Sequence, residues 1–505
     1  MILCIGCVRG DHGSGGITLA STTTGGRPGA RALLVEFNEL SPTLLDRFIA
    51  AGHLPHFRAF RDSSVVCTTD AGEDAPNLEP WIQWPTVHSG IPFAEHGVFA
   101  LGEGREKLRT PLLGDVLSAA GIPVGVFGSM NTAYSRRPGE PGYVVPDPWD
   151  VDGVAFPDSL QPFYETVSWA VQESSRNGLP GAGQLARFAA FLVRSGLRPA
   201  TVVAAVRQLV DERRVGGVAW RRASVLDDLS YDVFRTLNRR HGVRFATFFS
   251  NSTAHYQHYY WRDMEPELFD EAGDGAHADA VLHGYRRMDA LLGRIMADEP
   301  DSLLVLATAL SQEPWAESAK RTFRPHDFDA LFAFAGIRGA VAKPMMAEQF
   351  VVELASPDAA ADARRKLHAL TIDGARAVNA DLDGHRLQVG CFSDVGREGA
   401  TLAGGAGGAS RAFDELFYPI HTTRSGRHSR DGALWFRTGT HRVVEGRVAL
   451  TDIAPTILDH FGVATPAHMS GDVLPLYRTP EVPTQRSRPF SPLREASRVG
   501  ARQTL

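Results

Sequence analysis

Short apolar runs recur along the chain, and each of them ends in polar residues. They lie at residues 31–38, 64–69, 123–131, 243–249 and 302–308. A nearly continuous apolar run is typical of a strand buried on both faces of a parallel sheet, because a half-exposed strand alternates apolar and polar positions. The pattern therefore predicts five buried strands.

Helical spacing separates these runs. Residues 41–55 begin with Ser-Pro and carry apolar side chains at helical intervals, and residues 111–121 and 448–462 each end in a glycine that stops a helix. Alternation of this kind predicts an α/β fold with a mostly parallel sheet and helices on both faces. Ligands bind beyond the carboxyl ends of the strands in such sheets, so the polar residues after each strand are the candidate site.

Two regions interrupt the alternation. Residues 155–240 contain four helical patterns, and residues 342–400 show a strand–helix–strand pattern of their own. We therefore expect one α/β domain over residues 31–475, with a helical cap inserted at 155–240 and a small α+β unit inserted at 342–400. The Gly/Ser/Thr-rich leader at 1–30 and the Pro/Arg/Ser-rich tail at 478–505 have too little to bury, and both are predicted to be disordered.

Composition excludes several classes of protein. Among 505 residues, 43% are hydrophobic and 22% are charged, and the net charge is -6, so nothing in the balance favours nucleic-acid binding. No apolar run approaches the roughly 20 residues of a membrane span. Of the four cysteines, Cys4 and Cys7 form a CxxC pair that lacks the second pair of a zinc site. With no export signal or disulfide framework in view, we expect a cytoplasmic protein.

The stretch from residue 77 to 97 has the layout of a loop that enters a helix and closes on a glycine turn. Unpaired N–H groups at a helix N-terminus commonly face an anion. The stretch resembles the nucleophile loop of the alkaline phosphatase superfamily, in its type I phosphodiesterase/nucleotide pyrophosphatase branch. The resemblance places the nucleophilic Thr or Ser ten residues before Gly90, where this chain has Pro80.

A C-terminal block carries the most specific part of the resemblance. SGRHSRDGALWFRTG is followed by VALTDIAPTILDHFGVATPAHMSGDVL, which places His428 at the family's last metal-binding histidine. The segment FFSNSTAHYQHYYW places His255 at another metal-binding histidine and Asn251 where the family has an Asp. The resemblance spans residues 31–135, 243–310 and 420–475.

Other metal positions of the family have changed. The first strand ends in Asn38 instead of an Asp, with Glu39 beside it, and Ala309 and Leu310 replace an Asp-His pair. The resemblance therefore implies at most one divalent metal, with zinc the best candidate, held by Asn251, His255 and His428. A second metal is not supported, because amide and apolar side chains do not balance its charge.

The polar residues that follow the strands complete the predicted site. Glu79 and Glu39 are the candidate catalytic carboxylates. The candidate ligand-binding residues are Asn38, Gln83, Asn131 and Gln312. Structural alternatives stay open: a salt-bridged Glu79, backbone-bonded His255 and His428, a purely structural His96, and packing roles for Trp81 and Trp84. His258 is a weaker candidate for metal contact, and His421 or His441 would replace His428 if the register were shifted.

Two classes of function follow from this site. The first is a hydrolase or transferase, phosphodiesterase- or sulfatase-like, acting on a phosphate-, phosphonate- or sulfate-type ester of a small molecule or glycan. The second is a catalytically inactive relative that binds an anion, a sugar or a protein partner. The sequence does not fix the substrate or the oligomeric state. Without a hydroxyl at Pro80, ordinary alkaline phosphatase or phosphodiesterase turnover is predicted to be weak or absent.

Overall fold

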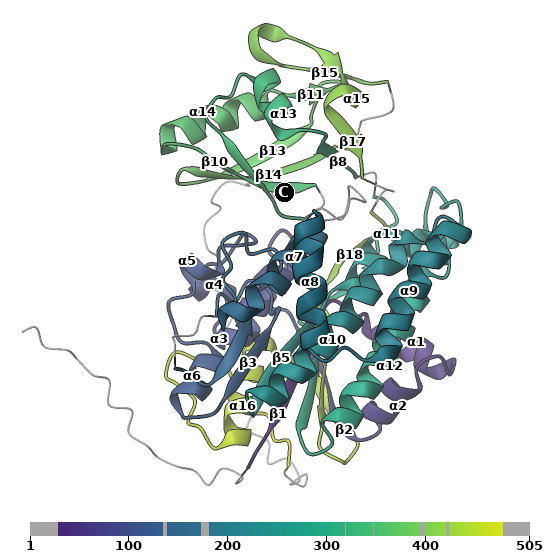
Figure 1. Ribbon diagram of the computed structural model, residues 1–505, viewed down its shortest axis with the longest axis vertical. Helices are drawn as coiled ribbons and strands as arrows, with labels where there is room; N and C mark the ends of the chain where they lie inside the picture. Colours follow the sequence, from purple (N-terminus) through teal and green to yellow (C-terminus); the bar gives the residue numbers. More distant parts are fainter. Residues whose placement is uncertain are drawn as a thin grey trace, which may run out of the picture.

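The computed structural model describes residues 29–134, 139–172, 181–318, 320–346, 348–393, 399–420 and 424–477. Cys4, Cys7, His421, nearly all of the predicted leader and the whole predicted tail lie outside these described residues. Figure 1 shows a larger α/β body and a smaller unit beside one end of it. Within the described residues, no helix has the length and apolar character needed to cross a membrane.

An eight-stranded sheet forms the centre of the larger body, in the order β20-β2-β19-β6-β1-β5-β3-β4. Its strands are β1 (Ala32–Phe37), β2 (Ser64–Asp70), β3 (Val124–Phe127), β4 (Gly142–Val145), β5 (Phe245–Ser250), β6 (Leu303–Ala307), β19 (Asp431–Arg437) and β20 (Arg442–Ala449). β1 runs parallel to both β5 and β6, whereas β19 is antiparallel to β2 and β6. The predicted fold class, a mostly parallel α/β sheet, is confirmed.

Side chains of β1 alternate between two cores, which explains why the strand is apolar throughout. Leu33, Val35 and Phe37 pack into one core, and Leu34 packs into the other. The first core is covered by α1 (Pro42–Ala50), α2 (Pro55–Arg61), α10 (Arg222–Arg240), α11 (Ser252–Met264) and α12 (Ala280–Asp298). The second is covered by α3 (Pro80–Ser89), α6 (Leu113–Ala119) and α16 (Ile453–Phe461). Helices therefore cover both faces of the sheet, as predicted.

Four α-helices occupy the described part of the region predicted as a cap, which excludes residues 173–180. They are α7 (Gln161–Gln172), α8 (Ala182–Arg194), α9 (Pro199–Arg214) and α10. α10 buries Tyr231, Phe234 and Leu237 against the sheet, so it belongs to the layer of helices on that face. α9 instead packs on α10, and α8 packs on α7, which leaves both of them on the outside.

The smaller unit is larger than the predicted insertion at 342–400. Its elements are β8 (Arg321–Pro325), α13 (Phe328–Ala335), β9 (Val341–Pro344), β10 (Gln349–Glu353), α14 (Pro357–His368), β11 (Thr371–Ile372), β12 (Ala375–Arg376), β13 (Val378–Asp383), β14 (Arg386–Ser393), β15 (Thr401–Ala403), β16 (Arg411–Ala412), α15 (Phe413–Leu416) and β17 (Phe417–Pro419). β8 pairs with both β14 and β17, so strands outside the predicted limits complete its sheet. Its hydrophobic core runs from Phe323 to Phe417 and is separate from the cores of the larger body.

A fully buried hydrogen-bond network fastens α3 to β1. Nε2 of His88 lies 3.0 Å from Oε1 of Glu36, and Nδ1 of His88 lies 2.9 Å from the hydroxyl of Tyr134. Ser129 donates to the same Glu36 oxygen over 3.0 Å. Because Tyr134 also accepts a hydrogen bond from Gly114, its own proton is directed to Nδ1, and Nε2–H of His88 donates to the carboxylate. α3 is thereby held with its N-terminus at the end of β1.

We expect His88→Ala to lower the free energy of unfolding by about 3 kcal/mol, because it leaves the buried Glu36 carboxylate without its imidazole donor. His88→Gln is the matched variant, since its amide nitrogen replaces the donor, and it should lower the free energy much less. Urea unfolding of the full chain measures both effects. Equal losses for the two variants would mean that the donor does not matter.

Candidate functional site

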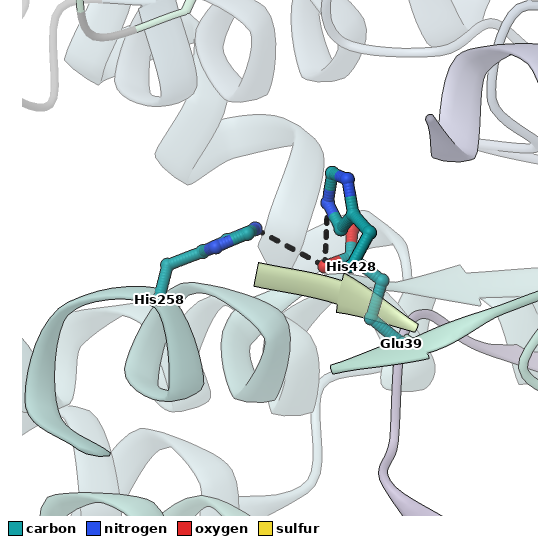
Figure 2. A group of neighbouring side chains, drawn as sticks. All are labelled: Glu39, His258 and His428. Atoms are coloured by element: carbon teal, nitrogen blue, oxygen red, sulfur yellow. Dashed lines mark ion pairs between the residues drawn. The ribbon is translucent and has the colours of Figure 1, made fainter. Parts of the chain in front are cut away.

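Five segments of the chain meet at the carboxyl end of β1. Glu39 follows β1, Glu79 stands at the N-cap of α3, and His258 lies on α11. The other two segments are β7 (Ser311–Pro314) and β18 (Gly426–Ser429), which form an antiparallel ribbon with Gln312 opposite His428. Figure 2 shows the rings of His258 and His428 directed at the Glu39 carboxylate from different elements.

The backbone places Glu39 in an unusual conformation. Its φ is +60°, in the left-handed region that residues with a side chain seldom adopt, and Ala309 after the neighbouring β6 has the same φ. The amide of Glu39 donates to the carbonyl of Thr308 over 3.2 Å, which ties the two strand ends together. Strained conformations of this kind persist where the surroundings enforce them, and they are concentrated at functional sites.

The two oxygens of Glu39 make different contacts. Oε2 lies 3.1 Å from Nε2 of His258 and 3.3 Å from Nε2 of His428. The same oxygen accepts a hydrogen bond from the amide of Gln312, and Oε1 accepts one from Nδ2 of Asn38 over 2.7 Å. The carboxylate is buried, so these contacts replace its hydration. Oε2 is the point on which both imidazoles converge.

The second nitrogen of each imidazole fixes its tautomer. Nδ1 of His258 lies 3.0 Å from the carbonyl oxygen of Gly426, which only accepts, so Nδ1 carries the proton. Nδ1 of His428 lies 3.2 Å from Oε2 of Glu79 and is protonated for the same reason. In the neutral form of each ring, Nε2 then directs a lone pair at Glu39. Two lone pairs facing a carboxylate require a cation, either a proton or a metal ion, between them.

A proton on Nε2 of one imidazole accounts for one of the two contacts with Glu39. Burial lowers the pKa of His428, but Glu79 and Glu39 outweigh it and raise this pKa to about 10. Burial raises the pKa of Glu39, yet His428 and His258 hold it well below its usual range. For His258, burial lowers the pKa and Glu39 opposes this only in part. His428 is therefore the imidazolium of the group, and neutral His258 still directs its lone pair at Glu39.

The three residues also fit a divalent metal ion. Each offers one ligand atom, and these atoms lie within 4.8 Å of one another. Two ligands of a tetrahedral zinc ion lie about 3.3 Å apart, which is close to both contacts made by Oε2. Apart from its 3.3 Å contact with Oε2 of Glu39, the buried Nε2 of His428 has no partner among the described residues. Both Nδ1–H groups are already held by oxygen acceptors, as those of metal-binding histidines usually are.

Asn251, a predicted metal ligand, does not offer its oxygen to this group. The indole of Trp84 can only donate, and it donates to Oδ1 of Asn38 over 2.8 Å, so Nδ2 of Asn38 must face the other way. That Nδ2 donates to Oδ1 of Asn251 over 2.7 Å as well as to Glu39. The two amides thus support the carboxylate, and Trp84 orients them.

His255, the second predicted metal ligand, lies away from the group. It is exposed on α11, where its ring packs against Tyr259 at a centroid distance of 4.9 Å. His258, three residues later in α11, occupies the position beside Glu39 that was predicted for His255. The phase of the helix does not predict this, because Tyr259, one turn later on the same side of α11, is buried.

Two further predicted ligand-binding residues hold loops. Oε1 of Gln83 accepts from the backbone of Glu79 over 2.9 Å, and its nitrogen donates to the carbonyl of Asn77. Asn131 has φ +56° and binds four backbone groups. Its oxygen accepts from Gly102 and Gly104, and its nitrogen donates to Trp81 and Ala100. These amides shape the loops around the site, and none of these bonds is directed at Glu39.

The positions that the resemblance assigns to the nucleophile and to a second metal remain apolar and buried: Pro80, Ala309 and Leu310. The nearby hydroxyl of Thr86 lies 3.0 Å from Nε2 of His96, inside α3. His96 also accepts from the amide of Val98, and burial lowers its pKa to about 4. A structural role for His96 agrees with these contacts.

Sequence patterns did not indicate the ion pair between Arg424 and Glu348 beside His258. Arg424 donates to Glu348 over 2.9 Å, and this arginine joins the larger body to the smaller unit. Its positive charge contributes to the low pKa of His258, and Glu348 raises the pKa of Arg424. Neither residue lies in a segment that the resemblance assigns to metal binding, so no motif pointed to the pair.

We expect His428→Ala to destabilise the metal-free protein by about 3–5 kcal/mol, because Glu39 would stay buried without its cationic partner. His255→Ala, on the exposed side of α11, should change the free energy of unfolding by less than about 0.5 kcal/mol. Urea unfolding with a chelator present compares the two variants. A small effect of His428→Ala would contradict the ion pair.

No protein-family model matches the sequence, and no curated protein matches it either. Among solved structures, the chain is similar to the phosphonoacetate hydrolase of Sinorhizobium meliloti 1021, with 14% identity, a TM-score of 0.38, and coverage of 84% of this chain and 94% of that chain. It is also similar to murine ectonucleotide pyrophosphatase/phosphodiesterase 5, with 7% identity, a TM-score of 0.40, and coverage of 88% of this chain and 97% of that chain. A phosphonate monoester hydrolase from Silicibacter pomeroyi shows 14% identity, a TM-score of 0.40, and coverage of 88% of this chain and 76% of that chain. These are members of the alkaline phosphatase superfamily, the family that the sequence resembles. The likeness concerns the fold and assigns no role to any residue of this chain.

Proposed function

We propose that this protein is a single-metal hydrolase or transferase of a phosphate-, phosphonate- or sulfate-type ester, with the metal held by Glu39, His258 and His428. The observation that carries the proposal is the convergence of two Nε2 atoms on Oε2 of Glu39, at 3.1 and 3.3 Å, with both Nδ1–H groups engaged elsewhere. The class of ester follows from the sequence resemblance. Zinc suits two imidazoles and one carboxylate, and three protein ligands leave one position open.

A bound divalent metal would supply positive charge to an ester oxygen and would lower the pKa of a water molecule at its open position. The protein supplies no hydroxyl in the place of the nucleophile, because Pro80 begins α3. Water is therefore the attacking group for hydrolysis, and the protein has to accept the proton that it loses.

Glu79 is placed to accept that proton. Its Oε2 lies 3.2 Å from Nδ1 of His428, and its side chain is 24% exposed, so it borders both the metal site and solvent. Glu39 does not suit this role, because both of its oxygens are engaged and the side chain is only 3% exposed. Of the two carboxylates predicted to be catalytic, Glu79 keeps the role of base, and Glu39 becomes a metal ligand.

Charge balance favours a singly charged substrate. Glu39 and Glu79 together offset the charge of a divalent cation, and the nearby Arg424 is paired with Glu348. A nearly neutral centre holds a dianionic monoester less firmly than a centre with surplus positive charge. A diester or phosphonate monoester of a small molecule or glycan therefore fits this site better than a phosphate monoester.

A second function, binding without turnover, is favoured by a different observation. Pro80, Ala309 and Leu310 remove the groups that the resemblance assigns to the nucleophile and the second metal, and the proton on His428 neutralises Glu39 without any metal. In this form the protein would bind an anionic or sugar ligand, or a protein partner, near the N-terminus of α3.

The metal assignment is tested by equilibrium dialysis of the full chain against zinc. We expect one zinc ion per chain, a large loss of affinity in Glu39→Gln and His258→Gln, and a 10–100-fold loss, roughly, in Glu79→Gln, whose carboxylate orients His428. His255→Gln is the matched control and should bind zinc like the unmodified chain. Loss of zinc in His255→Gln together with retention in His258→Gln would reverse the assignment.

Hydrolysis of an aryl phosphodiester, compared with the corresponding monoester, tests the reaction. We expect slow, zinc-dependent turnover that prefers the diester and that falls by about 10²–10⁴-fold in Glu79→Gln. Thr86→Ala should retain activity, because Thr86 is bonded to His96 within the helix. Loss of activity in Thr86→Ala would identify that hydroxyl as the nucleophile. Zinc binding without turnover of any ester would favour the binding protein.

A further inference from the structure

The pair of outer helices, α8 and α9, exposes an unusual number of aliphatic side chains. Among them Val193 is 81% exposed, Val206 is 55% exposed and Leu209 is 50% exposed. α9 is inverted relative to an ordinary surface helix, because the residues it buries are the polar Thr201 and Gln208. The fold of this chain therefore leaves the apolar side of α9 uncovered.

The exposed side chains of α9 form a stripe. Val202, Val206 and Leu209 follow one another at intervals of four and three residues, which places them on one side of the helix, and Val203 lies beside them. Val193 of α8 and Val215, just after α9, are also exposed. We call the exposed residues of these two helices, from 185 to 215, the α8–α9 surface. Figure 1 shows the two helices on the outside of the larger body.

Arginines border this stripe. Residues 181–222 contain eight arginines and two acidic residues, although the whole chain has a net charge of -6. The eight are Arg187, Arg194, Arg198, Arg207, Arg213, Arg214, Arg221 and Arg222. In the described part of the chain, no carboxylate forms an ion pair with Arg187, Arg194 or Arg207, all of which are exposed. This segment is therefore locally basic, and the composition of the whole chain conceals this.

Charge restricts what can cover the α8–α9 surface. Two copies that meet symmetrically through this face would bring their arginines together, so a symmetric dimer is opposed by repulsion. The chain end at 478–505 contains six arginines and two glutamates, so it would also be repelled. The occupant must be anionic and must also accept a row of aliphatic side chains.

We propose that the α8–α9 surface binds an anionic lipid membrane. Valine and leucine side chains along one side of a helix, with arginines at the border, match the face of an interfacial helix, which inserts its apolar residues between headgroups while the basic residues contact anionic phosphates. Nucleic acid offers the phosphates but little that would bury the valines. The proposal does not depend on the metal site.

Co-sedimentation of the full chain with lipid vesicles tests the proposal. We expect binding to vesicles of phosphatidylcholine with about a third phosphatidylserine, little binding to phosphatidylcholine alone, and weaker binding as salt screens the charges. Val206→Asp/Leu209→Asp should lower the partition coefficient by about tenfold or more, and Arg207→Glu/Arg214→Glu should do the same.

Exposed residues elsewhere provide matched controls. Val341→Asp/Val443→Asp and Arg365→Glu/Arg411→Glu alter side chains that are exposed on β9, β20, α14 and β16, and they should bind vesicles like the unmodified chain. Thermal unfolding confirms that each variant is folded. The proposal is overturned if anionic vesicles do not bind, or if both α8–α9 variants bind unchanged. It is also overturned if those variants instead abolish self-association or binding to RNA.

Discussion

The Glu39 carboxylate, buried between two imidazoles, is the constraint on which the site depends. Its residue is held in the left-handed region at the end of β1, and its Oε2 is contacted by His258, His428 and Gln312. The lone pairs of two neutral imidazoles directed at a buried carboxylate require a cation between them. Because the protons on the Nδ1 atoms are already engaged, that cation must lie on the side of Glu39, as a proton on His428 or as a metal shared by all three residues.

The rest of the site supports this arrangement. Trp84 orients Asn38, Asn38 binds Glu39 and Asn251, and the β7–β18 ribbon sets Gln312 opposite His428. One turn of α3 beyond Trp84, His88 fastens the helix to Glu36. Asn38 and Asn251, which stand where the resemblance expects aspartates, thus form a connected polar network with Glu39. A network with this many satisfied groups is expensive to disturb, because each broken contact leaves a buried polar atom unpaired.

The sequence predicted the strands and the parallel sheet, because a strand buried on both faces has a distinctive apolar run, as at Leu33–Phe37. From the resemblance, and because strand ends meet at one edge, it also predicted that Asn38, Glu79, Asn251, His255 and His428 would converge on one cleft. The metal-ligand roles predicted for His255 and Asn251 do not agree with the structure: His255 is exposed on α11, and the oxygen of Asn251 accepts a hydrogen bond from Asn38. The limits predicted for the smaller unit were too narrow, because β8 pairs with β14 and β17, which lie far away in the sequence.

Anomalous diffraction from zinc-soaked crystals, recorded at the zinc absorption edge, tests the central claim most directly. The account predicts one strong peak, about 2.0–2.2 Å from Oε2 of Glu39 and from Nε2 of His258 and His428. A peak between Asn251, His255 and His428 would contradict the assignment of ligands. No peak, with His428 in direct contact with Glu39, would show that a proton alone occupies the centre.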